Sequence, residues 1–361
     1  DDLSRGLGDV YKRQAYMNAI DEVGKLNLIK NLNNGVSIKI SALHPRYEMR
    51  KFKDLESELI PRLIELVHYA HSKDVEITID AEEQDRLTLS LNIIEKLALD
   101  KVIKNWTGFG IALQAYGKRS INVIHWINKI LDKREKMHLR LVKGAYWDYE
   151  IKHAQVFGYE DYPVYSKKSL TDISFLLCAK EILKNEKIYA KFATHNAHTI
   201  SSVHQLGQGK DYEFQRLYGM GELLYQSAEK VLNLEKKPSV YAPIGSYKDL
   251  LPYLVRRLLE NGANSSFINR LLDPETDANW LAENPAIRIE KEKIDIPLPK
   301  NIFTERKNSL GFDLSENSNL ENLEKSISAH KKNKINAESI YMNCDEKEKV
   351  GQKVYSIANN E

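Results

Sequence analysis

Polar residues recur at one end of the short apolar runs in this sequence. They are Lys39, Asp80 with Glu82 and Glu83, Gln114, Arg140 with Lys143, His195, Gln215 and Tyr241. If the runs are strands, a lysine or aspartate that points inward is costly to bury unless it is paired or functional. One such residue is most often a salt-bridged exception. Seven runs that each carry one at the same end favour a binding or catalytic site instead.

A pair of arginines, Arg256 and Arg257, lies in a helical stretch further along the chain. Tyr253, Arg257 and Glu260 follow the spacing i, i+4 and i+7, which places them on one stripe of a helix with Arg256 about 100° away. Two arginines on a helix usually belong to a solvated face. Two guanidinium groups can also hold a carboxylate between them. The pair therefore suggests a substrate that carries a carboxylate.

Other patterns give weaker signals. His195 and His198 have a spacing that could ligate a metal, but on a strand they face opposite sides and no third ligand lies close in sequence, so we expect no metal. The Gly108–Gly110 and Gly219–Gly221 pairs lack the third glycine of a dinucleotide fingerprint. Serine-nucleophile motifs of the Gly-x-Ser-x-Gly type are absent from the sequence. Cys178 lies in an apolar helical stretch and is interpreted as a core residue.

Lys39 leaves a second kind of enzyme open, an aldolase-like barrel whose lysine amine forms a Schiff base with a carbonyl substrate. The sequence offers no neighbour that would tune this amine, and the arginine pair favours carboxylate binding instead.

The elements that position these residues alternate between two kinds. Seven apolar, β-branched runs predict strands at residues 37–41, 76–81, 109–116, 139–146, 189–196, 212–219 and 239–245. Stretches with a period near 3.6 residues predict helices at residues 55–72, 87–97, 121–131 and 170–183, and a further helix spans 249–261 with Gly262 at its C-cap. The alternation predicts an α/β protein with a parallel sheet and, at this count, a (β/α) barrel. Seven strands are one fewer than the usual eight.

Composition excludes several classes of protein. The chain has 361 residues, 42% of them hydrophobic, which suffices for a large core, but its apolar runs are too short to cross a bilayer. A formal net charge of +2 gives no general preference for nucleic acid. Two cysteines rule out a disulfide framework. A cytoplasmic setting is expected.

Three regions differ in character. We expect residues 15–284 to form the barrel and residues 285–361, which are polar with prolines at their start, to be a linker and the truncated start of another domain. Residues 1–14 contain two glycines, six charged side chains and no period-2 apolar pattern. They are expected to be a non-native leader that stays outside the sheet.

Five blocks of the sequence together resemble one enzyme family. They are SIKISALHPRYE (37–48), DAEEQDRLTLSL (80–91), LRLVKGAYWDYEIK (139–152), FATHNAHT (192–199) and YLVRRLLENGANSSF (253–267). In this order they resemble the proline dehydrogenase domain of the bifunctional bacterial proline-utilisation enzymes. The resemblance runs from about Tyr16 to Ser309 and is highly specific because the blocks are long and collinear.

The resemblance implies a distorted (β/α)8 TIM-type barrel that binds FAD without a Rossmann fold. It implies that L-proline gives a hydride to flavin N5 and becomes 1-pyrroline-5-carboxylate, the first step of proline catabolism to glutamate. Electrons would pass to a membrane quinone, with peripheral contact at the inner membrane. A second domain of the parent protein, an L-glutamate gamma-semialdehyde dehydrogenase, would use NAD, and residues 308–314 resemble its entry. No nucleic acid partner is implied for this chain.

The resemblance also assigns roles to residues at matching positions. The residues implied to act on the substrate are Lys39, Asp80, Tyr241, Tyr253, Arg256, Arg257 and Glu260. Lys39 and the two arginines would grip the proline carboxylate, the tyrosines would pack around its ring, and Glu260 would hold an arginine. The residues implied to contact the flavin are Gln114, Arg140, Lys143, Gly144, Ala145, Trp147, Ser166, Thr194, His195, Asn196, Gln215 and Leu217.

The sequence departs from the family at three places. Ser166 stands where the family usually has threonine, Tyr218 replaces a common histidine, and residues 1–14 occupy the place of the family's first barrel strand. The count of seven strands and the resemblance therefore agree that strand one is missing. An alternative to the flavoenzyme is an inactive truncated barrel that binds no flavin, because an open sheet edge leaves backbone groups unpaired.

Overall fold

The computed structural model of the chain describes residues 2–245, 250, 251, 253–255, 283–292 and 296–331. The chain divides into two compact units, Asp1–Leu320 and Glu321–Glu361. The first unit contains the whole described sheet and every described candidate site residue. The predicted helix at residues 249–261 lies mostly outside the described residues.

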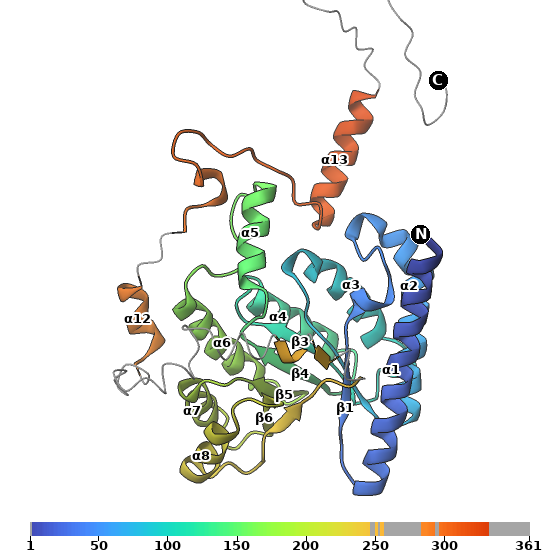
Figure 1. Cartoon of the computed structure of the whole chain (residues 1–361), viewed down its shortest axis with the longest axis vertical. Helices are drawn as coiled ribbons and strands as arrows, with labels where there is room; N and C mark the ends of the chain where they lie inside the picture. The colour runs from blue at the N-terminus through green and yellow to red at the C-terminus, as the bar shows by residue number, and fades with distance from the viewer. Residues whose placement is uncertain (1, 246–249, 252, 256–282, 293–295, 332–361) are drawn as a thin grey trace, which may run out of the picture. The chain divides into compact units, whose positions relative to one another are not determined.

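In the described residues the sheet has seven strands, all parallel, in the order in which they occur along the chain. Their bounds are β1 (Gly35–Ile38), β2 (Glu76–Ile79), β3 (Phe109–Gln114), β4 (Met137–Val142), β5 (Ile188–Ala193), β6 (Tyr212–Leu217) and β7 (Ser239–Tyr241). The sheet curls into a half-barrel surrounded by helices (Figure 1). Each strand falls within or beside a run predicted from the sequence, so the α/β class and the strand count are confirmed. Among the described residues, β1 and β7 each pair with one strand only.

Helices α2 to α8 lie between successive strands along the chain and, with α1, surround the sheet, whereas α12 and α13 follow the last strand (Figure 1). Their bounds are α1 (Asp2–Lys30), α2 (Phe52–Ser72), α3 (Leu87–Ala98), α4 (Ser120–Leu131), α5 (Trp147–Phe157), α6 (Lys168–Ile182), α7 (Ala197–Leu206), α8 (Glu222–Leu232), α12 (Pro285–Lys291) and α13 (Asn317–His330), with short 3-10 turns η1 (Ile40–Leu43), η2 (Met49–Lys51), η3 (Gln84–Arg86) and η4 (Pro299–Asn301). The four predicted connecting helices are confirmed. In α2, the predicted stripe of Leu55, Leu59 and Leu63 is fully buried.

The strands divide their side chains between two environments. In β4, Met137, Leu139 and Leu141 are buried in the apolar core under the helices. The alternate residues His138 and Arg140 line the inner face of the sheet. This period of two follows from the pleat, because successive side chains of a strand point to opposite faces. The inner face is therefore polar, whereas branched apolar residues usually fill such barrels.

Residues 2–14 are helical and continue into α1 without a break. The expectation that this segment stays outside the sheet is confirmed for residues 2–14. Further along α1, Ala19, Ile20 and Val23 are buried in the core. The α1–β1 connection is then closed by Asn27, whose side chain accepts a 3.0 Å hydrogen bond from the Asn34 amide and donates one of 3.0 Å to its carbonyl. This closure fixes where β1 begins, and so where Lys39 lies.

Residues 296–320 belong to the first compact unit, although the sequence predicts a linker there. The Tyr162 hydroxyl donates a 2.6 Å hydrogen bond to the Pro297 carbonyl, and the Gly311 amide donates one of 3.0 Å to the Gly158 carbonyl. Gly158 ends α5 with φ +64°, a left-handed conformation that favours glycine. A Cβ built on it would collide with the Ser309 carbonyl oxygen. The end of α5 and this segment therefore form a close backbone contact.

Candidate active site

Three of the predicted site residues meet at the carboxyl ends of the strands. The Arg140 Nη1 group donates a 2.9 Å hydrogen bond to Asp80 Oδ1, and the Tyr241 hydroxyl donates one of 3.2 Å to Asp80 Oδ2. The Arg140 guanidinium also lies 5.0 Å from the centre of the Tyr241 ring, within the range of a cation–π contact. Burial raises the pKa of Asp80, although the charges of Arg140 and Lys39 oppose that rise. The three side chains thus hold one another in place across β2, β4 and β7.

Lys39 follows β1 directly and faces the same region. Its Nζ donates a 3.2 Å hydrogen bond to the Tyr146 hydroxyl, and its backbone amide donates one of 3.1 Å to the Tyr16 hydroxyl. Burial works to lower the pKa of Lys39, but Tyr146 together with Asp80 and Glu82 outweighs burial and raises it above its ordinary value. A Schiff-base lysine needs a lowered pKa to supply a free amine. The environment of Lys39 therefore favours a permanent cation over a nucleophile.

A hydrogen-bonded chain connects the loops after β2, β3 and β4. The Gln114 amide nitrogen donates a 2.8 Å hydrogen bond to the Glu82 carbonyl, and its oxygen accepts one of 3.1 Å from the Ala145 amide. Glu82, which is buried, accepts a 3.0 Å hydrogen bond from the Ser41 amide. Gly144 has φ +144°, and a Cβ on it would strike the Tyr116 ring. Gln114 therefore fixes the backbone of the Gly144–Ala145 loop.

Two further predicted residues, Lys143 and Trp147, are fixed by contacts beyond the end of β4. Lys143 forms an ion pair with Asp172 of α6. The Trp147 indole nitrogen donates a 2.9 Å hydrogen bond to the Tyr165 carbonyl. Ser166, next to Tyr165, is half-buried. These contacts shape the rim of the site beyond the end of β4.

The residues after β5 organise the start of α7. The Asn196 side chain accepts a 2.9 Å hydrogen bond from the Thr199 amide and so caps the helix. Thr194 is buried and accepts a 3.2 Å hydrogen bond from the Asn196 amide through its hydroxyl. His195 Nε2 accepts a 3.1 Å hydrogen bond from the Leu217 amide at the end of β6. That acceptor role requires an unprotonated Nε2, so His195 is neutral in this arrangement.

Gln215 joins this group to the first cluster, because its side-chain oxygen accepts a 2.7 Å hydrogen bond from Arg140 Nε. A cavity of about 1180 Å³ lies against the inner face of the sheet and is lined by Arg140, Gln215 and Tyr241 as well as Tyr16 of α1. It exceeds the roughly 300–1,000 Å³ of ordinary ligand pockets. The inner face can therefore hold a large ligand next to these polar groups.

The structure brings together Lys39, Asp80, Arg140, Gln215 and Tyr241. Arg256, Arg257 and Glu260 lie outside the described residues. The neighbouring Tyr253 is described, and its hydroxyl donates a 3.2 Å hydrogen bond to the Tyr218 carbonyl.

Sequence reasoning missed two tyrosines of this site. Tyr146 contacts Lys39 and lies within the block LRLVKGAYWDYEIK. Its position directly after Ala145, a predicted site residue, could have identified it from the sequence. Tyr16 lies in α1, far from Lys39 in sequence, and no local pattern marks it. Its pKa is raised by burial.

Neither a metal cluster nor a membrane span occurs in the described part of the chain. Among these residues no group of three or more His, Cys, Asp or Glu side chains could hold a metal ion. The pKa of His198 is lowered by burial and by the charges of Arg288 and Lys143. No described helix is long and apolar enough to pass through a membrane.

A parallel sheet wrapped by helices, with polar side chains converging at the carboxyl ends of its strands, defines the barrel class of α/β enzymes. The sequence profile of the proline dehydrogenase family matches residues 9–270. The chain belongs to the proline dehydrogenase family.

Relatives place the chain more narrowly within that family. It is 43% identical to the bifunctional protein PutA of Escherichia coli strain K12 over 335 residues, covering 87% of this chain and 25% of that protein. It is 44% identical to the PutA of Klebsiella aerogenes, again over 87% of this chain but 26% of the relative. A crystal structure of a Bradyrhizobium japonicum PutA point mutant superposes with a TM-score of 0.85 at 41% identity, covering 90% of this chain and 34% of that one. The chain thus spans about a quarter of the length of these curated relatives.

Proposed function

We propose that this chain carries out the FAD-dependent oxidation of L-proline to 1-pyrroline-5-carboxylate, with the electrons passed to a quinone. The observation that carries the proposal is the cluster in which Lys39 and the Asp80–Arg140–Tyr241 group meet at the carboxyl ends of the strands. Membership of the proline dehydrogenase family supports the choice of substrate.

The cluster suits an amino acid substrate because it places a fixed cation beside aromatic and acidic groups. Lys39 stays protonated, since Tyr146, Asp80 and Glu82 raise its pKa. A protonated lysine can bind the proline carboxylate by a charge-assisted hydrogen bond. Arg256 and Arg257 would complete that carboxylate site, as their sequence pattern suggests. Tyr241 and Tyr253 would pack on the proline ring, with Tyr241 held in place by Asp80.

The residues present also fit FAD. Two of them, Arg140 and Gln215, line the large cavity on the inner face, and the guanidinium, ammonium and amide donors of the set match a group that carries carbonyl oxygens and phosphates. The residues that would hold it are Gln114, Arg140, Lys143, Gly144, Ala145, Trp147, Ser166, Thr194, His195, Asn196, Gln215 and Leu217. When bound, FAD accepts at N5 the hydride that leaves the proline ring. The protein's own part is to bind the substrate carboxylate, orient the ring, and exclude water from the inner face.

The longer relatives motivate a wider proposal about the parent protein. Since the relatives are named bifunctional, we propose that a second, NAD-dependent domain oxidises the glutamate semialdehyde to which the product opens. Residues 308–314 would be its entry, residues 285–361 the linker and the start of that domain, and residues 1–14 a leader foreign to the barrel. Transfer of electrons to quinone would bring the protein to the inner membrane as a peripheral partner.

A second candidate is a barrel that does not retain flavin. The specific observation in its favour is that β1 and β7 each have one unpaired side among the described residues, so the inner face is open between them. Exposed strand edges are templates for non-native pairing.

One experiment separates the two candidates. The purified chain is incubated with FAD, freed of excess cofactor, and mixed anaerobically with L-proline while the flavin absorbance is recorded. Bleaching of bound flavin by L-proline, and not by D-proline, is the expected result. Retained FAD that L-proline cannot reduce would contradict the proposed reaction. Failure to retain FAD would support the second candidate.

A further inference from the structure

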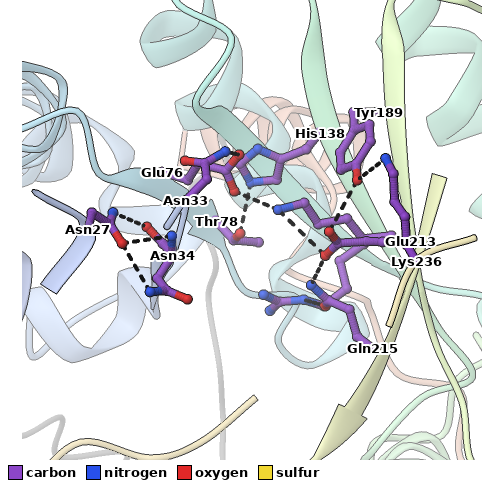
Figure 2. Close-up of polar contacts among 12 residues, drawn as sticks. Asn27, Asn33, Asn34, Glu76, Thr78, His138, Tyr189, Glu213, Gln215 and Lys236 are labelled. Atoms are coloured by element: carbon purple, nitrogen blue, oxygen red, sulfur yellow. Dashed lines mark hydrogen bonds and ion pairs between the residues drawn. The ribbon is translucent and has the colours of Figure 1, made fainter. Parts of the chain in front are cut away.

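A second polar layer, formed by Lys191, Glu76, Glu213 and Tyr189, lies on the inner face of the sheet (Figure 2). Lys191 of β5 is its centre, with a side chain only 8% exposed. Its Nζ lies 2.6 Å from Glu76 Oε2 and 3.9 Å from Glu213 Oε1. The Tyr189 hydroxyl donates a 3.2 Å hydrogen bond to the other oxygen of Glu213. No predicted site residue belongs to this layer.

Glu213 also contacts Gln215, a residue of the proposed site outside this layer. It accepts a 2.8 Å hydrogen bond from the amide nitrogen of Gln215, the next inward-facing residue of β6 (Figure 2). The oxygen of the same amide accepts the 2.7 Å hydrogen bond from Arg140 Nε. Gln215 is buried, with only 7% of its surface exposed.

These two contacts fix the direction of the amide. An ionised carboxylate only accepts hydrogen bonds, and a guanidinium only donates them. Glu213 therefore pairs with the NH2 group of Gln215, and Arg140 pairs with its oxygen. The reversed amide would set an acceptor against an acceptor at one end and a donor against a donor at the other, so a single orientation satisfies both neighbours.

Arg140 depends on that orientation. Its Nε–H is held by Gln215, its Nη1 by Asp80 and its guanidinium face by Tyr241. A planar guanidinium with a fixed fork of donors cannot rotate about one contact without disturbing the others. The direction set by Glu213 is thus transmitted through Gln215 to the group at the centre of the proposed site.

We infer that Glu213 is a positioning residue: by fixing the amide of Gln215, it sets the orientation of Arg140 toward Asp80 and the bound flavin. The inference rests on the proposed function for its link to flavin. Within the described part of the chain, Glu213 is bonded to Tyr189, Lys191 and Gln215, of which Gln215 alone is a proposed cofactor residue.

Glu76 supplies a matched control. Its side chain is 16% exposed against 15% for Glu213, and both carboxylates pair with Lys191. Glu76 is otherwise bonded to Asn33 at 3.0 Å and does not contact Gln215. Glu76→Met and Glu213→Met therefore remove the same charge from the same lysine, but only Glu213→Met removes the acceptor that holds the Gln215 amide.

The test compares FAD affinity, measured by fluorescence quenching, among variants whose thermal stability is also recorded. Glu213→Met is expected to raise the FAD dissociation constant about 10-fold, because the Gln215 amide loses its acceptor and no longer holds the Arg140 donor in one orientation. Glu76→Met is expected to leave it within about twofold of the wild type. Equal weakening in the two variants would show that Glu213 acts only by balancing Lys191.

One further variant keeps the charge and removes only the contact. Glu213→Asp shortens the side chain by one methylene, which withdraws the carboxylate from the Gln215 amide, so it should weaken FAD binding as Glu213→Met does. Wild-type FAD affinity in Glu213→Asp would overturn the inference.

A readout without flavin separates this inference from the proposed function. In protein labelled with 15N-arginine, the Nε–H signal of Arg140, assigned by its loss in Arg140→Lys, should be protected from solvent exchange in the wild type and in Glu76→Met. It should lose that protection in Glu213→Met and Glu213→Asp. If the wild type fails to bind FAD, the proposed function is wrong, while unchanged protection in the Glu213 variants would still refute the positioning role.

Discussion

At the scale of single residues, the surroundings of Lys39 decide between two kinds of chemistry. Tyr146 accepts a hydrogen bond from its ammonium group, and two acidic residues lie near enough to raise its pKa. Such a lysine is a stable cation, which suits binding of a carboxylate and opposes attack on a carbonyl. The role of Lys39 is therefore to bind substrate by charge.

Replacing Lys39 with methionine should raise the KM for L-proline about 10- to 100-fold, since a charge-assisted hydrogen bond to a substrate carboxylate is lost. The flavin spectrum should change little. Steady-state proline:dye reductase assays measure the KM. Lys118→Met, which removes an exposed lysine paired with Asp161, is the control and should keep the wild-type KM. An unchanged KM in Lys39→Met would mean that Lys39 does not bind the carboxylate.

Glu150 of α5 is a buried residue with an unusual environment. It accepts a 2.8 Å hydrogen bond from the Gln84 amide, and burial, with the charges of Asp85 and Glu83 adding to it, raises its pKa to about 7. A raised pKa means that the folded chain binds this proton more tightly than the unfolded chain, whose glutamate titrates near 4.5. Stability contributed by Glu150 is therefore full below pH 4.5 and falls as the pH rises to about 7.

Glu150→Gln should remove this pH dependence, because glutamine keeps the acceptor for Gln84 and cannot ionise. The free energy of unfolding of the variant, relative to wild type, should rise by up to about 3 kcal/mol between pH 4.5 and pH 8. Urea unfolding of both proteins across this range measures the difference. A difference that is flat with pH would show that Glu150 titrates as an ordinary glutamate.

At the scale of elements, the sequence predicts the strands well because each has two distinct faces. Apolar residues such as Leu139 and Leu141 alternate with Arg140, and this period of two is visible without a structure. Residues at the strand ends, including Lys39 and Asp80, could therefore be placed in one site. The same alternation continues into Glu213 and Lys191, which were overlooked because they lie in the middle of runs rather than at their ends.

Contacts between distant segments could not be predicted in this way. Tyr16 reaches Lys39 because α1 packs beside β1, and Ser309 reaches Gly158 because the segment after η4 returns to α5. Neither contact is indicated by a periodic pattern in the sequence. The polar composition of residues 296–320 likewise gives no sign of the backbone hydrogen bond that joins this segment to the end of α5.

The contact at Gly158 can be tested by adding one methyl group. Gly158→Ala should destabilise the chain by more than the cost of its left-handed φ alone, because the new Cβ would collide with the Ser309 carbonyl. We expect a total of about 2–3 kcal/mol, of which about 1 kcal/mol comes from the backbone conformation. Gly209→Ala is the matched control, since Gly209 has φ +71° with nothing within 4 Å of a Cβ, and should cost only the smaller amount. Equal losses in both variants would mean that residues 296–320 do not depend on α5.

At the scale of the whole molecule, the polar inner face and the open sheet both reduce the stability of the folded chain. In the part of the chain described, β1 and β7 leave one side of each strand unpaired, and a cavity of about 1180 Å³ adjoins them. Unpaired backbone groups and an unfilled inner face both reduce stability. A ligand that fills the inner face and binds the folded chain alone should restore part of that loss.

FAD is therefore expected to stabilise the chain, and metal ions are not. At a free FAD concentration about 100 times its dissociation constant, the gain is about 2.7 kcal/mol, which should raise the thermal midpoint by a few degrees. Differential scanning calorimetry with and without FAD measures the shift, and riboflavin at the same concentration is the control for weak ring stacking.

Prior dialysis against EDTA should change neither this shift nor the proline:dye activity, because the described part of the site is built from cationic and amide donors rather than from clustered metal ligands. A loss of activity that zinc restores and FAD does not would refute a flavin site, and an unshifted midpoint at saturating FAD would mean that the open inner face does not bind the cofactor.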